Sequence, residues 1–329
     1  MYKENYNIHN IISFQIVNNN ITGLLNKINP EYEYFKVDTE VDPDFRITVA
    51  KVFRNVDEIK SLKYKFKKKS TYWEAEILEH NNSFIELTIV PRLQGIRNLF
   101  QFTALKNIYV RSLLYYSLIN KGCTLIHSSA VNINGKAYVF VGRPGVFKTS
   151  LIMDFLRQTG TSFLGEENVL LMDEKIYPFP LNIQSLSHKI KYYKHEDPPS
   201  YIHKLMLGLS LLKNKNINIP ISNCCYPEKI FYLEKGNKFD YKKVKLENTI
   251  DKLVSNEIQE IDLNPTHSLS GISNNYFSEY LHEFGLMEEI KEKIRNIFLN
   301  NFREVDFYSV SMPKSYDTKL INELLRRIF

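Results

Sequence analysis

The stretch KAYVFVGRPGVFKTSLIMDFL, residues 136–156, decides how this chain is interpreted. Its first part, KAYVFVG, is almost wholly apolar, which is typical of a strand buried on both faces of a sheet. Its last part, LIMDFL, has the spacing of a helix with one apolar face, made by Leu151, Ile152, Phe155 and Leu156. The stretch therefore predicts a buried strand, a tight loop and a helix in direct succession.

The loop between strand and helix, residues 142–149, matches the phosphate-binding pattern GxxxxGK[ST] at every fixed position but one. In such a loop, backbone N–H groups and the helix N-terminus face a polyphosphate. Lys148 would then place its charge on the β- and γ-phosphates, and Thr149 would place its hydroxyl on Mg²⁺. The alternative is a strand, turn and helix that bind no ligand. The predicted nucleotide-binding residues are Gly142, Arg143, Pro144, Gly145, Val146, Phe147, Lys148, Thr149 and Ser150.

A histidine precedes the loop on the same predicted hairpin. The segment TLIHSSAVNI, residues 124–133, would pair with the apolar strand through a turn at Asn134–Gly135. His127 lies on this first strand, 15 residues before Gly142. A core histidine is the ordinary explanation, and the nearby phosphate loop makes His127 a candidate catalytic residue.

Two neighbouring carboxylates follow the loop. Glu166 and Glu167 lie 18 and 19 residues after Lys148, in SFLGEENVLLM (residues 162–172), which we interpret as the next strand. Such a pair would hold a metal ion and accept a proton from an attacking hydroxyl. A glutamate pair in a surface turn is the alternative.

The segments CTLIHSSAVNINGKAYVFVGRPGVFKTS (residues 123–150) and TSFLGEENVLL (residues 161–171) resemble the nucleotide-binding core of the HPr kinase/phosphorylase family. That P-loop core is similar to phosphoenolpyruvate carboxykinase. His127, Lys148 and Thr149 match the family pattern residue by residue. The resemblance implies an α/β fold with a P-loop kinase-like mixed sheet. It also implies ATP or another phosphoryl donor, Mg²⁺, and a hydroxyl acceptor on a peptide, protein or small molecule.

The resemblance also implies roles for the site residues. Lys148 and the loop amides would bind the polyphosphate, and Thr149 with Glu166 would hold Mg²⁺. Glu167, oriented by His127, would act as the base, although the two glutamates are open to exchange. The implied reaction is ATP-dependent transfer of the γ-phosphoryl group to a hydroxyl.

Two departures from the family pattern occur within the resembling region, residues 122–185. Phe147 replaces a glycine, and its side chain would shift the loop or limit how closely the backbone wraps the phosphates. The acidic pair is glutamate where the family has aspartate. The Arg-Gly-rich signature that accompanies phosphorylase activity is not found after the acidic pair, so we do not expect a reversible HPr-modifying enzyme. A nucleotide-binding regulatory or scaffold protein without phosphoryl transfer is the alternative function.

The remaining chain suggests a second domain. Residues 1–95 are expected to form a mostly-β recognition or assembly domain, because FRITVAKVF (45–53), YWEAEILEH (72–80) and SFIELTIVP (83–91) alternate apolar and polar residues. Asn81–Asn82 would be the turn of a hairpin. Residues 96–121 are predicted to form an amphipathic connecting helix that ends at Lys121–Gly122, and residues 122–329 the nucleotide-binding domain.

The lysine-rich segment KYKFKKK, residues 63–69, has two interpretations. As an edge strand, it would turn its lysines to water and block edge-to-edge pairing. As a contact for nucleic acid, lysines from Lys60 to Lys69 would bind phosphates. The net charge of +6 is too modest for a dedicated nucleic-acid binder, so we expect the edge strand.

Beyond residue 185 the pattern predicts elements without further chemistry. These are a helix over 201–212, a core strand over 229–236, a helix over 275–300, a strand over 304–312 and a helix over 318–328. The histidines of this part lack the mutual spacing of metal ligands. They are His188, His195, His203, His267 and His282.

Composition bounds the remaining classes. A hydrophobic fraction of 43% over 329 residues excludes a disordered or fibrous chain. Three cysteines, Cys123, Cys224 and Cys225, make a poor disulfide framework and are expected to be buried free thiols. No secretory signal and no apolar run of about 18 residues is present, so we expect a cytoplasmic protein without a membrane partner. A homo-oligomer stays open.

Overall fold

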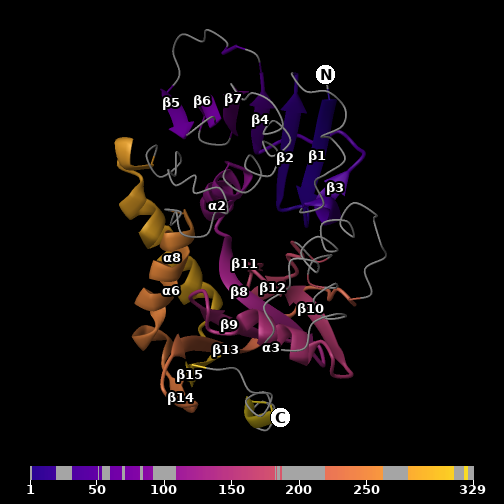
Figure 1. Ribbon diagram of the computed structural model, residues 1–329, viewed down its shortest axis with the longest axis vertical. Coiled ribbons are helices and arrows are strands. Elements are labelled where there is room, and N and C mark those ends of the chain that lie inside the picture. The colour runs from indigo at the N-terminus through magenta and orange to yellow at the C-terminus, as the bar shows by residue number, and fades with distance from the viewer. Residues whose placement is uncertain are drawn as a thin grey trace. The chain divides into compact units, whose positions relative to one another are not determined.

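The chain forms an α/β structure with two mixed β-sheets in the computed structural model (Figure 1). The described residues are 2–19, 32–50, 52–53, 60–68, 71–81, 84–91, 109–181, 183, 186, 219–261, 281–314 and 322–324. They divide between two compact units. The first consists of Met1–Lys121 and Gln259–Ile290, and the second of Gly122–Ile258 and Lys291–Phe329.

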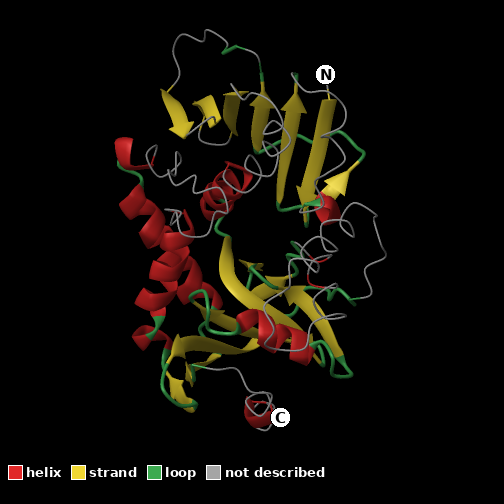
Figure 2. Ribbon diagram, viewed as in Figure 1, coloured by secondary structure: helices red, strands yellow, loops and turns green. Residues whose placement is uncertain are grey.

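A seven-stranded sheet is the main element of the first unit (Figure 2). Its strands are β1 (Tyr2–Ile8), β2 (Ile12–Asn18), β3 (Lys36–Val37), β4 (Phe45–Val49), β5 (Lys60–Lys68), β6 (Thr71–Asn81) and β7 (Phe84–Pro91). They follow the order β3-β1-β2-β4-β7-β6-β5, in which β4 runs parallel to β2 and β7 and the other pairs are antiparallel. The short helix η2 (Glu33–Phe35) precedes β3. The prediction of a mostly-β N-terminal region is confirmed, although β4 ends at Val49 and not at Phe53.

Period-two alternation gives this sheet an apolar face. Phe14 of β2 stacks on Phe45 of β4 with ring centroids 4.9 Å apart, and Ile47 and Leu87 are buried on the same face. The predicted hairpin is confirmed, because β6 pairs antiparallel with β7. Its turn is not at Asn81–Asn82, since Asn81 is the last residue of β6 and pairs with Phe84. β5 pairs with β6 and ends the sheet, as the edge-strand interpretation predicts.

The described part of the connecting helix is shorter than the predicted helix, and it is not amphipathic. α2 covers Arg111–Asn120, and residues 92–108 lie outside the described part. Every side chain from 112 to 119 is buried, so this part of the helix is a core helix and not an amphipathic one. It ends as predicted, with Gly122 in a left-handed conformation at φ 75°.

A second mixed sheet organises the second unit. Its strands are β8 (Thr124–Ile133), β9 (Lys136–Gly142), β10 (Thr161–Gly165), β11 (Asn168–Met172), β12 (Lys175–Tyr177), β13 (Tyr226–Lys235), β14 (Asp240–Val244) and β15 (Asp306–Met312). The order is β12-β11-β8-β9-β13-β15-β14, and β10 also pairs with β8. β13 runs parallel to both β9 and β15, so the carboxyl ends of these three strands meet at one edge. The helices of this unit are α3 (Lys148–Phe155), η5 (Leu246–Asn248), α6 (Ile250–Ile261) as far as Ile258, and α8 (Met287–Asn301) from Lys291 onward.

Helices pack on both faces of this sheet. Phe155 of α3 and Phe231 of β13 both stack against Phe140 of β9, with ring centroids 5.3 and 5.0 Å away. Tyr232, which points to the opposite face from Phe231, lies under the Lys252 ammonium of α6 at 5.3 Å. The strand before the loop is therefore buried from both sides, as its composition predicts.

Two expectations for the C-terminal half need correction. The predicted helix over 275–300 is broken before α8, where Gly285 has φ 68°. Residues 259–290 belong to the first unit, although the sequence assigned them to the nucleotide-binding domain. Apolar periodicity shows that a helix has a buried face, but it does not show which of the two sheets that face packs against. The expected helix over 201–212 and four of the five distal histidines lie outside the described residues, as does most of the helix over 318–328.

Within the described part of the chain, no helix combines the length and apolar character needed to cross a membrane. All three cysteines are free. Cys123 and Cys225 are buried as expected, whereas Cys224 is exposed.

Candidate functional site

The hairpin of β8 and β9 delivers the loop. Its turn, Asn134–Gly135, has both residues at positive φ (53° and 85°), as a two-residue hairpin turn with the right twist requires. Alternation along β8 places His127 on the same face as Val131, whose side chain packs in the core with Leu151 of α3. His127 thus faces the side on which the loop turns into α3.

The loop leaves the sheet at Gly142. Gly142 stands in register with Leu233 of β13, and a Cβ at Gly142 would lie 2.5 Å from the Leu233 carbonyl oxygen. A glycine is therefore needed for the close approach of the two strands.

Phe147 occupies the left-handed conformation that glycine usually takes in this loop, with φ 64° and ψ 21°. Such a conformation costs a bulky L-residue about 1–2 kcal/mol. The Phe147 side chain packs against the core cluster that includes Phe140 and Val146. Phe147 therefore holds a backbone conformation that suits glycine, with apolar packing to offset the strain.

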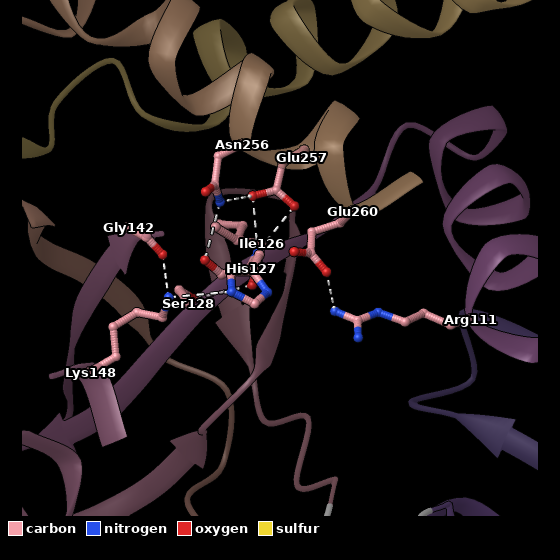
Figure 3. Close-up of polar contacts among 9 residues, drawn as sticks. All are labelled: Arg111, Ile126, His127, Ser128, Gly142, Lys148, Asn256, Glu257 and Glu260. Atoms are coloured by element: carbon pink, nitrogen blue, oxygen red, sulfur yellow. Dashed lines mark hydrogen bonds and ion pairs between the residues drawn. The ribbon is translucent and has the colours of Figure 1, made fainter. Parts of the chain in front are cut away.

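Lys148 begins α3 and is only 9% exposed. Its ammonium donates to the carbonyl oxygens of Gly142 and Arg143, the latter at 3.4 Å. Its Nζ also lies 3.3 Å from His127 Nε2 (Figure 3). Since an ammonium has donors and no acceptor, Nε2 accepts in this contact, and the neutral imidazole carries its proton on Nδ1. The sequence did not predict this contact.

The predicted strand over 162–172 is broken at the acidic pair. β10 and β11 both pair antiparallel with β8, and Glu166 and Glu167 lie half-buried in the bend between them. β8 holds this bend twice. Ser129 Oγ donates to the Glu166 carbonyl oxygen at 2.5 Å, and the Ser128 N–H donates to the Glu167 carbonyl oxygen at 3.1 Å. The residues between two strand segments are thereby released from the pleat, so their side chains can turn toward the loop.

Glu166 reaches the loop. The Thr149 hydroxyl donates a hydrogen bond to Glu166 Oε1. A hydroxyl and a carboxylate side by side are oxygen donors of the kind Mg²⁺ prefers, and Mg²⁺ usually takes one or two protein ligands with phosphate oxygens and water. The residues therefore fit a magnesium ion, even though no group of three or more His, Cys, Asp or Glu side chains gathers among the described residues.

A second lysine lies at the loop. Lys235 ends β13, and its Nζ is 3.0 Å from the position that a Cβ on Gly145 would take. The pKa of Tyr232, on the same strand, is raised by burial and by the neighbouring Glu234 carboxylate, and the positive charges of Lys252 and Arg143 offset this rise only in part. Lys235 is not among the site residues predicted from the sequence. The signal available was its place at the carboxyl end of a strand parallel to β9, where ligands of α/β sheets gather.

The structure therefore brings four predicted site residues together in two contacts, His127 with Lys148 and Thr149 with Glu166, made by the first two residues of α3. Glu167 lies beside them in the same bend. When the chain is compared with known proteins, no family model matches it, and no curated protein matches its sequence at a significant level.

Proposed function

We propose that this chain is a P-loop kinase of the HPr kinase-like type, which binds ATP with Mg²⁺ and transfers the γ-phosphoryl group to a hydroxyl. The hydrogen bond between Thr149 and Glu166 carries the proposal, because it joins the two expected metal ligands next to Lys148. A strand, turn and helix without a ligand would give no reason for a half-buried carboxylate to turn toward the first turn of α3.

Each residue has a defined task in this reaction. Lys148 donates to phosphate oxygens in place of the loop carbonyl oxygens that it contacts now. His127 keeps the Lys148 ammonium directed toward the loop. Mg²⁺, when bound at Thr149 and Glu166, would neutralise charge on the β- and γ-phosphates. Glu167 accepts the proton of the acceptor hydroxyl. As the proton leaves, the hydroxyl oxygen forms the new bond to the γ-phosphorus, and the bond from the γ-phosphorus to the oxygen of ADP breaks.

The acceptor is a hydroxyl of a peptide, a protein or a small molecule. Every candidate catalytic residue lies between residues 127 and 167, so we assign acceptor recognition or assembly to the mostly-β N-terminal unit. We place the protein in the cytoplasm, where its three cysteines remain reduced.

One observation favours a second candidate function. Phe147 holds a strained backbone conformation that glycine would adopt without cost. Phosphoryl transfer depends on accurate positioning of the phosphates, so it tolerates strain in the loop poorly. A nucleotide-binding regulatory or scaffold protein without phosphoryl transfer is therefore the alternative.

Calorimetry and label transfer test the proposal together. The parent protein should bind ATP with Mg²⁺, and Lys148→Ala should weaken the affinity at least tenfold, because it removes a charge-assisted contact of about 1.5–3 kcal/mol. Lys136→Ala is the matched control. Lys136 is an exposed lysine at the start of β9, the strand that leads into the loop, and it pairs with Glu228. Unchanged affinity in Lys148→Ala would contradict nucleotide binding at this loop. Transfer of label from γ-labelled ATP to a hydroxyl acceptor would separate the kinase from the scaffold.

A further inference from the structure

A fully buried carboxylate lies behind the proposed phosphate site. Glu257 of α6 is 0% exposed, and both its oxygens accept the backbone N–H of His127, at 2.9 and 3.0 Å (Figure 3). Asn256 Nδ2 donates to Glu257 Oε1 at 3.2 Å and to the His127 carbonyl oxygen at 3.3 Å. The two adjacent side chains thus hold the N–H and the C=O of one residue of β8.

The place of this contact follows from the course of β9. β8 and β9 pair from Ile133↔Lys136 to Ser128↔Val141, and the next pair would be His127 with Gly142. β9 leaves the sheet at Gly142 to form the loop, so the edge of β8 at His127 needs another partner. Glu257 supplies both of its carboxyl oxygens there as acceptors for the His127 N–H.

Burying a polar group is costly unless the group is hydrogen-bonded, so a residue that only filled space would not be a glutamate. The contact between Glu257 and the His127 backbone also affects the His127 side chain. His127 Nε2 is the acceptor for Lys148, and the direction of its imidazole depends on where the His127 backbone is held. Glu257 and Lys148 are thereby linked through His127.

We propose that Glu257 is a positioning residue for the phosphate site: it fixes His127 so that the imidazole, as its Nδ1–H tautomer, holds Lys148 at the loop. The inference rests on the proposed function for its role in nucleotide binding. Its structural part, the state of His127, is independent of any ligand.

Glu257→Gln tests the proposal in the full chain, because the side chain keeps its shape but an NH₂ donor replaces one of the two acceptor oxygens. Glu260→Gln is the matched control on the same helix, where the carboxylate pairs with Arg111 at 2.6 Å (Figure 3). The first readout is the ¹⁵N spectrum of the His127 imidazole at pH 8, above the usual imidazole pKa of about 6.5. The second is the Kd for ATP with Mg²⁺.

The parent and Glu260→Gln should show the single Nδ1–H tautomer of His127, and their Kd values should agree within about twofold. Glu257→Gln should show a mixture of tautomers and bind ATP about three- to tenfold more weakly, which corresponds to about 0.6–1.4 kcal/mol. Glu257→Ala should show the same change more strongly, and if it does not fold, Glu257→Gln decides alone.

The proposal is overturned if folded Glu257→Gln keeps the parent tautomer, if its Kd is unchanged, or if Glu260→Gln weakens binding equally. If the parent does not bind ATP at all, the proposed function fails. The tautomer measurement still decides in that case whether Glu257 positions His127.

Discussion

The Thr149 hydroxyl donates a hydrogen bond to the Glu166 carboxylate, although 17 residues separate the two in the chain. The contact connects the first turn of α3 with the bend between β10 and β11. β8 pairs with β10 and β11 and hydrogen-bonds the bend through Ser128 and Ser129. It also pairs with β9, which runs through the loop into α3. The contact thus joins two parts of a single scaffold, as the proposed metal site requires.

Glu166→Gln should raise the Mg²⁺ concentration needed for half-maximal nucleotide binding by about tenfold or more, because a neutral amide is a poor ligand for Mg²⁺. Glu167→Gln should leave this requirement within a few-fold of the parent. It should instead lower kcat by about 10²–10⁴-fold, the usual contribution of a general base. Magnesium titrations of ATP binding and of turnover measure both effects. If Glu167→Gln raises the Mg²⁺ requirement and Glu166→Gln lowers kcat, the roles of metal ligand and base are exchanged. Equal effects of the two variants would contradict both assignments.

Phe147→Gly and Phe147→Ala should separate backbone strain from packing. Both lose the phenylalanine contacts with the core, but only glycine takes φ 64° without strain. We expect Phe147→Gly to be more stable than Phe147→Ala by about 1 kcal/mol, measured by urea unfolding. Equal stabilities would mean that the left-handed conformation is not retained.

The same glycine variant distinguishes the two candidate functions. If phenylalanine is a tolerated variant of the loop, Phe147→Gly should change the rate of phosphoryl transfer little. Transfer by the glycine variant alone would instead identify the parent as a nucleotide-binding protein that no longer transfers phosphate.

Lys235→Ala should weaken ATP binding by about threefold, because an exposed cation contributes less than about 1 kcal/mol and is screened by salt. The loss should shrink as the salt concentration rises. Lys242→Ala removes another exposed lysine, on β14, and controls for the change in net charge. Calorimetry at low and high salt checks the prediction. Equal losses in the two variants would mean that Lys235 acts only through overall charge.

Iodoacetamide at pH 8 should modify Cys224 before Cys225 and Cys123 in the folded protein. Burial raises the pKa of the Cys225 thiol to about 11, and neighbouring Cys224 adds to the rise while Ser222 lowers it. The reactive thiolate of Cys225 therefore forms only as the pH approaches that value. Mass spectrometry of digested protein measures the order, and guanidinium should make all three react.

The same shift has a consequence for stability. Because the pKa of Cys225 is higher in the folded chain than its ordinary value of 9.0, the protonated thiol stabilises the fold below pH 9. This contribution should be lost between about pH 9 and about pH 11. Unfolding measured across this range should show a smaller loss in Cys225→Ala than in the parent.

The sequence by itself determined the local parts of this protein. The turn at Asn134–Gly135, the buried strand β9, the loop and α3 all follow from short-range patterns, and the structure confirms their bounds nearly to the residue. Hairpin turns, buried strands and amphipathic helices each leave a signal within about ten residues. The choice of Lys148, Thr149 and Glu166 as candidates also required no more than spacing along the chain.

Only the tertiary structure decided what those candidates contact. The break of the predicted strand at Glu166 depends on Ser128 and Ser129 of β8, and the approach of Lys235 depends on β13 lying beside β9. Glu257 meets His127 across 130 residues, and α6 carries no pattern that announces a buried carboxylate. Such contacts arise where a strand leaves its sheet and exposes a backbone group that another element must satisfy. Periodicity records that an element has a buried face, but it does not record which distant residue the fold brings to it.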